Sequence, residues 1–174
     1  MPSATIPTDV IDRLAGITDD SAVAELRRQK LDPVRFAQGS YDALLEPADP
    51  AGVSLVELHA VAYRAALLTR FPDSAEWHRA RLEEIGAAPE LIRAIAEFSN
   101  GHGDGEIGPR LEAILAHTNR VTVSPGSAQP EHIAQLKAAG LTPTEIVTLG
   151  QLLGFVSYQI RAIAVARAFG DAAR

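Results

Sequence analysis

The 174-residue sequence contains no cysteine, which excludes disulfide bonds, thiolate metal ligands and thiol redox chemistry. Aromatic residues are also scarce, at 5% of the chain against a hydrophobic content of 47%. The core must therefore consist mainly of Ala, Leu, Ile and Val, which pack helices closely. This composition favours an all-α fold.

Basic residues are few as well. The formal net charge is -6, the pI is about 5.3, and only one lysine follows residue 30. Proteins that bind nucleic acid or anionic membranes need clustered Lys and Arg, so we expect neither partner. The first residues, MPSATIPTDVIDRL, lack the basic segment and apolar run of a signal peptide. A cytoplasmic location is the resulting expectation.

Two segments that lie 88 positions apart have similar sequences: AGVSLVELHA at 51–60 and AGLTPTEIVT at 139–148. Each contains an S/T-x-x-E capping box, formed by Ser54 with Glu57 and by Thr142 with Glu145, which predicts a helix start. Any two well-capped helices share this motif, but the preceding A-G-V/L favours a structural duplication. We therefore predict two related helical halves within one domain over 1–174, with a lead-in over 1–50 and a core over 51–170.

Other helix starts are predicted from capping residues. Asp32 can cap a helix with Pro33 at its first position, and this helix should end near Leu45. Asp73 and Glu76 form a weaker capping box before WHRARLEEIG.

The last predicted helix runs from Pro143 to about Phe169 and is roughly 40 Å long at 1.5 Å per residue. Between Ile146 and Val156 it is apolar on nearly every face, more than one amphipathic stripe requires. A membrane span is the alternative, but polar residues interrupt every run of about 18 apolar residues. We expect this helix to be buried at the centre of the fold and in a subunit interface.

The glycine-rich segment NGHGDGEIG at 100–108 does not fit either site that its composition suggests. It follows a helix and lacks the Lys-Ser/Thr ending of a phosphate loop, and it lacks the alternating carboxylates of a calcium loop. A flexible connector is the prediction.

The segment LVELHAVAYRAALLTRFPDSAEWHRARLEEIGAAPELIRAI at 55–95 resembles the core of the carboxymuconolactone decarboxylase and alkylhydroperoxidase D superfamily. The tail LKAAGLTPTEIVTLGQLLGFVSYQIRAIA is similar to uncharacterised, peroxidase-related members. In the thiol members, a helix carrying Glu precedes C-x-x-C-x-x-x-H. The resemblance places Phe71 and Ser74 at the cysteine positions, His78 at the histidine and His59 at the glutamate. It implies an all-α, alkylhydroperoxidase D-like fold with a long buried C-terminal helix.

The missing cysteines exclude the chemistry of the thiol relatives. In those proteins a thiolate attacks the peroxide and a second thiol resolves the sulfenic acid. Phe71 can do neither, and the Ser74 hydroxyl is not reversibly oxidised. Peroxiredoxin activity is therefore not expected, whereas the resemblance leaves open the cysteine-independent, decarboxylase-like branch.

His78, His59 and Tyr63 are the predicted catalytic residues. His78 is on the apolar face of its helix, and His59 and Tyr63 are one turn apart on the neighbouring helix. Two imidazoles can supply the proton donor and acceptor that loss of carbon dioxide from an activated acid requires. A lone histidine on such a face is also common as a core residue. The predicted substrate-binding residues, partly from the resemblance, are Ser74, Phe71, Trp77 and Arg161.

No cofactor and no metal are predicted, because His59, His78 and Asp73 or Glu76 do not have a recognised ligand spacing. We expect a small-molecule substrate and a homo-oligomer, either a dimer, a trimer or a hexamer, as the resemblance implies. The function that the sequence favours is a decarboxylase-like lyase or related acid/base enzyme acting on a small carboxylated molecule. The alternative is a non-catalytic protein that binds a ligand or has a structural role in an oligomer.

Overall fold

A computed structural model describes residues 9–99 and 106–172. Within these two ranges the chain forms helices and no β-strand, which confirms the all-α prediction. Most of the glycine-rich segment lies outside the described residues. The elements are α1 (Val10–Ala15), α2 (Ala22–Arg28), α3 (Leu31–Leu45), α4 (Leu55–Leu68), α5 (Pro72–Glu84), α6 (Pro89–Glu97), α7 (Pro109–Val123), a 3₁₀ turn (Pro125–Ser127), α8 (Pro130–Ala138) and α9 (Pro143–Ala172).

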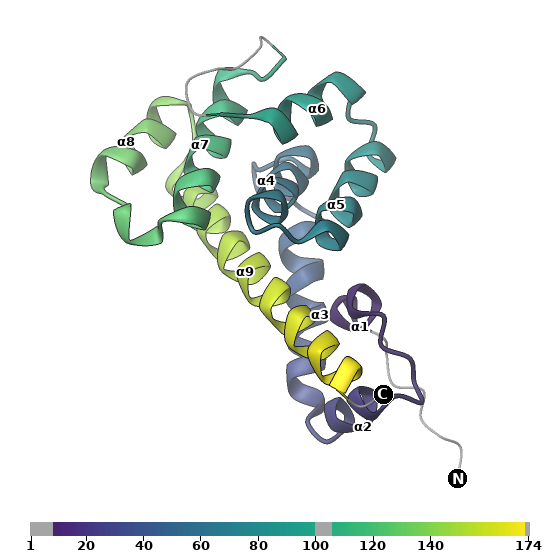
Figure 1. The fold of residues 1–174 in the computed structure, drawn as a ribbon. Coiled ribbons are helices and arrows are strands. Elements are labelled where there is room, and N and C mark those ends of the chain that lie inside the picture. Colours follow the sequence, from purple (N-terminus) through teal and green to yellow (C-terminus); the bar gives the residue numbers. More distant parts are fainter. Residues whose placement is uncertain (1–8, 100–105, 173–174) are drawn as a thin grey trace.

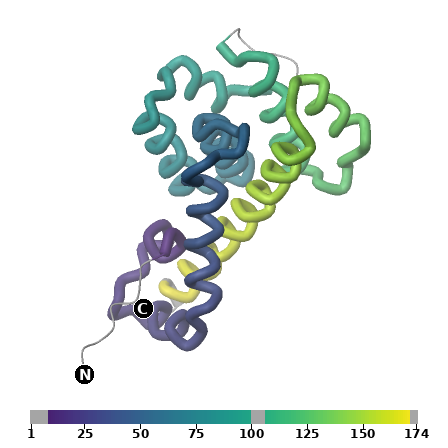
Figure 2. The backbone as a smooth tube through the Cα atoms, turned by 180° about the vertical axis from the view of Figure 1, so that it is seen from behind, coloured from purple at the N-terminus to yellow at the C-terminus, as the bar shows by residue number. Residues whose placement is uncertain are grey.

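Helix α4 is the centre of the larger part of the molecule, where α5, α6, α7 and α9 pack around it (Figure 1). The α4 residues from Leu58 to Ala66, apart from Arg64, are buried, and most of them are Ala or Val, so neighbouring helices can approach closely. From this part α9 extends to the N-terminal helices, where it packs against α1, α2 and α3. Figure 2 shows α3 and α9 side by side from the opposite direction. Helix α9 thus connects both parts of the fold.

Helix α9 is long and apolar enough to cross a membrane, but 44% of the residues in its most apolar window are buried inside the protein. Leu149, Leu152, Val156 and Ile163 are at most 1% exposed, as in the core helix of a globular fold. Its other face carries exposed apolar side chains, including Val147 at 61%. The buried C-terminal helix predicted from the sequence is therefore present, with one face left uncovered in the single chain.

Two predicted helix starts are wrong in detail. Helix α3 begins at Leu31, so Asp32 lies inside its first turn instead of capping it. Helix α5 begins at Pro72, and Phe71 precedes it without a capping side chain. Proline at the first helical position needs no hydrogen-bond acceptor for its nitrogen, so α5 starts there and the Asp73 box does not form.

The two capping boxes of the repeat both form. In the first, Ser54 and Glu57 bond reciprocally to each other's backbone N–H groups. In the second, the Thr142 N–H donates to Glu145 at 2.5 Å and the Glu145 N–H donates to Thr142 at 3.3 Å. Each box satisfies backbone groups that a helix terminus leaves without partners. The similar segments therefore start α4 and α9 in the same way.

Arg110 of α7 joins these two helix starts. Its guanidinium lies 2.8 Å from a carboxylate oxygen of Glu57 and 2.8 Å from one of Glu145. The same group donates to the carbonyl oxygens of Gly52 at 3.0 Å and Gly140 at 3.3 Å. These four partners are two pairs of equivalent positions in the repeat. One side chain therefore ties both copies to α7.

Close approach at this junction requires glycine at position 52. Gly52 has a φ of 93°, and a Cβ there would lie 2.6 Å from Glu145 Oε1. Any larger residue would suffer an unfavourable backbone conformation and a clash with a carboxylate that Arg110 binds.

We predict that Arg110→Met lowers the free energy of unfolding by about 2 kcal/mol, because it leaves two shielded carboxylates facing each other without a cation. Urea denaturation measures this change. Arg93→Met, at an exposed position of α6, is the matched control and should change stability by less than about 0.5 kcal/mol. Equal effects of the two variants would contradict the assigned role of Arg110.

Candidate functional site

His59 of α4 and His78 of α5 face each other in the interior. Their Nδ1 atoms lie 3.1 Å apart, and the ring centroids are separated by 5.4 Å with 43° between the planes. The side chains are sealed from solvent, at 1% and 0% exposure. The structure therefore joins the two predicted catalytic histidines directly, as a hydrogen-bonded pair.

Burial keeps both rings neutral. Desolvation is the main cause that lowers the pKa of His59 to about 4, and the positive charge of Arg81 lowers it further. Glu46 and a hydrogen bond with the Leu45 backbone oppose this change. Desolvation also holds the pKa of His78 well below its usual value, and His59 adds to the effect. At neutral pH the pair carries no charge.

The Nδ1 contact limits the possible tautomers. One ring donates its Nδ1–H and the other accepts at an unprotonated Nδ1 across 3.1 Å. The interaction with the Leu45 backbone, which raises the pKa of His59, favours the arrangement in which His78 donates and His59 accepts. In that arrangement His78 Nε2 is an unprotonated base.

Several interior polar atoms have no hydrogen-bond partner among the described residues. They include His78 Nε2, the Ser74 hydroxyl one turn earlier on α5, and both amide atoms of Gln159 on α9. All three residues are 0% exposed. A buried polar group without a partner costs about 1–3 kcal/mol, so each of these atoms is a candidate contact for water or a ligand. Among the described residues, Gln159 has neither a hydrogen-bond partner for its amide nor an exposed position.

No protein-family model matches the sequence, and no curated protein matches it. The structure is similar to a crystal structure described as an alkylhydroperoxidase AhpD core, an uncharacterised peroxidase-related protein from Ralstonia eutropha JMP134. The TM-score is 0.68 at 17% identity, over 94% of this chain and 91% of that one. An uncharacterised peroxidase-related protein from Silicibacter sp. TM1040 gives a TM-score of 0.67 at 13% identity, over 94% and 88% of the two chains. The chain has the alkylhydroperoxidase D-like fold. At these identities the likeness establishes the fold and not the reaction.

The remaining predicted site residues on or next to α4 and α5 divide into two groups. Tyr63 is buried one turn beyond His59, and burial raises the pKa of its hydroxyl. Phe71 and Trp77, by contrast, make structural contacts with other helices. The Arg167 guanidinium lies 5.2 Å from the Phe71 ring, and Trp77 Nε1 donates to the Tyr41 hydroxyl at 2.9 Å.

Helix α1 takes part in the same contacts. Arg13 lies over the Trp77 ring at 5.3 Å, and Arg167 donates to the Leu14 carbonyl while it pairs with Asp73. These interactions hold α1 and the end of α9 against α5. No sequence pattern pointed to Arg167, because its partners come from α1 and from the start of α5, both far from Arg167 in the sequence.

Arg161 does not lie with the histidines. It is exposed on α9, donates to the carbonyl and hydroxyl of Ser157, and lines a separate cavity between α4, α7 and α9. Neither His59 nor His78 lines that cavity. The prediction that Arg161 binds a substrate beside the histidine pair is therefore not supported by its position.

The carboxylates considered as metal ligands are engaged elsewhere. Asp73 pairs with Arg167, and Glu76 pairs with Arg79 at 2.6 Å. Within residues 9–99 and 106–172, no group of three His, Asp or Glu side chains is arranged to hold a metal ion.

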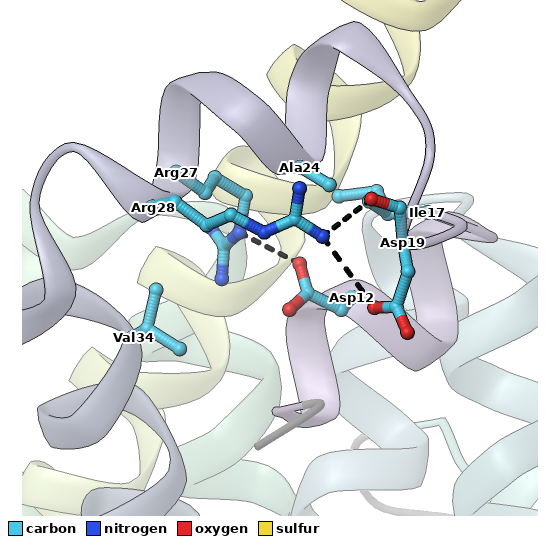
Figure 3. A pocket seen from close by; sticks show the side chains of 7 residues that line it. All are labelled: Asp12, Ile17, Asp19, Ala24, Arg27, Arg28 and Val34. Atoms are coloured by element: carbon cyan, nitrogen blue, oxygen red, sulfur yellow. Dashed lines mark hydrogen bonds and ion pairs between the residues drawn. The ribbon is translucent and has the colours of Figure 1, made fainter. Parts of the chain in front are cut away.

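A polar hollow between α1 and α2 is structural. Arg27 lies 2.7 Å from Asp12, and Arg28 donates to the Asp19 carbonyl (Figure 3). Arg27 also lies 2.7 Å from buried Asp9. The hollow measures about 20 Å³, enough for a single water molecule. It is an ion-pair network that fixes α2 to α1.

We predict that acid weakens the fold through the histidine pair. In the unfolded chain the His59 ring binds a proton below about pH 6.5, whereas in the folded protein it stays neutral down to about pH 4. Stability is therefore full above pH 6.5 and is lost as pH falls towards 4, by about 3 kcal/mol for His59. Urea denaturation at a series of pH values measures this loss.

His59→Asn/His78→Asn should remove this part of the pH dependence, since amides do not titrate. His132→Asn on α8 is the control: it keeps an acceptor for the Gln129 N–H and should retain the wild-type slope. A double variant with an unchanged slope would show that the pair does not couple folding to pH.

Proposed function

We propose that this chain is a cysteine-independent acid/base enzyme, a decarboxylase-like lyase acting on a small carboxylated molecule. The supporting observation is the free Nε2 of His78, which is buried and oriented through the Nδ1 contact with His59. Two neutral imidazoles in contact are suited to proton transfer. Ser74, with its unpartnered hydroxyl, supplies a hydrogen bond to the substrate.

The reaction balances with one proton from solvent. The C–C bond to the carboxylate breaks, carbon dioxide leaves, and the electron pair stays on the adjacent carbon as an enolate. His78, protonated at Nε2 before the step, transfers that proton to the carbon and returns to its neutral form. A low pKa makes the protonated ring a strong acid, which favours this transfer. His59 orients the His78 ring, and the two rings share the proton at the contact between their Nδ1 atoms.

Substrate access requires movement, because both rings are sealed. Helix α1 is the element that we assign to this movement. It has six residues, and its contacts with α5 run through the side chains of Arg13 and Arg167. Val10, Ile11 and Leu14 of α1 also pack into the core, but a helix of six residues buries less surface than α4 or α9 and opens at lower cost.

The alternative is a non-catalytic ligand-binding or structural member of the fold. The observation that favours it is the sealed position of the two rings, at 1% and 0% exposure. In that case the pair is a packed core contact and carries no turnover.

We also propose that the protein forms a homo-oligomer in the cytoplasm. Exposed apolar side chains on α9, Val165 and Phe169 at 57% each, support an interface with a second copy. Phe36 of α3, at 69% exposure, extends this surface along the groove that α3 and α9 form.

Carbon dioxide release from carboxymuconolactone and from acetoacetate tests the lyase. We expect His78→Asn to lower kcat/KM at least about 100-fold, because asparagine can still donate towards His59 but lacks the second nitrogen. The wild-type rate should rise as pH is lowered from about 8 to about 6, since a larger fraction of His78 is then protonated. His132→Asn should keep the wild-type rate and profile. Release that is equal in wild type and His78→Asn would favour the non-catalytic alternative.

Peroxide reduction separates this chain from thiol relatives. With a dithiol reductant, wild-type protein should consume an organic hydroperoxide no faster than buffer does, because it has no sulfur nucleophile. Phe71→Cys/Ser74→Cys places a C-x-x-C pair at the first turn of α5, where a helix N-terminus lowers thiol pKa. This variant should consume hydroperoxide measurably. Activity in the wild type would overturn the exclusion.

A further inference from the structure

A second cavity lies between α4, α7 and α9, away from the histidine pair. Its volume is about 480 Å³, within the range of about 300–1,000 Å³ of small-molecule sites. Its walls are largely apolar and include Ala65, Val121, Leu153, Val156 and Ile160. The cavity is therefore large enough for a small organic molecule with an apolar body.

Two glycines of α9, Gly150 and Gly154, form part of this wall. A Cβ added at either position would meet no atom within 4 Å, so packing in the single chain does not require glycine there. Glycine inside a helix costs about 1 kcal/mol relative to alanine. The space that both glycines leave open is space for a ligand.

The polar groups of the cavity favour an anion. Arg161 is its one charged lining residue, and no Asp or Glu lines it, although the whole chain has a net charge of -6. One guanidinium nitrogen bonds to Ser157, and no carboxylate of the described residues pairs with Arg161. The Thr122 hydroxyl is buried and has no partner within the described chain. A planar guanidinium with free N–H groups is well matched to a carboxylate.

We infer that this cavity is a binding site for a small carboxylate with an apolar tail or ring. The carboxylate pairs with Arg161, and the apolar part lies along Gly150 and Gly154 against the α4 and α7 walls. The site does not depend on His59 or His78.

Isothermal titration calorimetry with octanoate tests this site, with octanol as the uncharged comparison. Wild-type protein should bind one octanoate per chain with a Kd of about 0.1 mM, and octanol about tenfold more weakly. Arg161→Gln should weaken octanoate about tenfold and leave octanol unchanged.

Gly154→Leu fills the cavity and should abolish binding of both ligands. Leucine favours a helix more than glycine does, so this variant should melt at or above the wild-type temperature. Gly39→Leu on α3 is the matched control, because Gly39 also has open space at its Cβ and shares the groove between α3 and α9 with Gly154, but does not line the cavity. That control should bind octanoate as wild type does.

His78→Asn should also bind octanoate normally, so failure of the proposed lyase activity and failure of this site are separate results. Octanoate that fails to saturate wild-type protein at millimolar concentration would overturn the assignment. Failure of binding because a second copy of the chain covers the cavity would overturn it as well. Equal binding by Gly154→Leu and wild type would overturn it as well.

Discussion

The arrangement of the fold depends on the contact of Arg110 with the starts of α4 and α9. These two helices form the centre of the molecule, and both begin with a glycine turn and a capping box. Each box places a carboxylate at a helix N-terminus, where the helix dipole favours negative charge. Arg110 binds both carboxylates and two glycine carbonyls, which fixes the angle between the helices. Helices α5 and α7 both pack against α4.

The histidine pair is a consequence of this arrangement. Helix α5 packs against α4 as a hairpin, so His59 and His78 meet although 19 positions separate them. Closely packed Ala and Val side chains exclude water, and this burial holds both rings neutral. The same burial leaves His78 Nε2 and the Ser74 hydroxyl without partners. An imidazole that is stable only when uncharged readily gives up a proton that it has acquired.

Helix α9 has three different environments along and around its length. One face is in the core, one lines the cavity at Gly154 and Arg161, and one exposes Val147 and Val165. An amphipathic helix needs only the first of these environments and a polar surface. The apolar surplus of α9 therefore corresponds to two additional surfaces, a cavity wall and a face available to another copy of the chain.

The sequence by itself determined the features that act over a few residues. The capping boxes at Ser54 and Thr142 and the proline start of α9 formed as predicted, because a backbone group and its partner lie within one turn. Asp73 shows the limit of such patterns, since a nearby proline at the helix start displaced the expected box. Only the tertiary structure decided that Trp77 binds Tyr41, that Arg161 lines a cavity of its own, and that His59 and His78 touch. These contacts join different helices, and their geometry depends on how the helices pack, which local spacing does not encode.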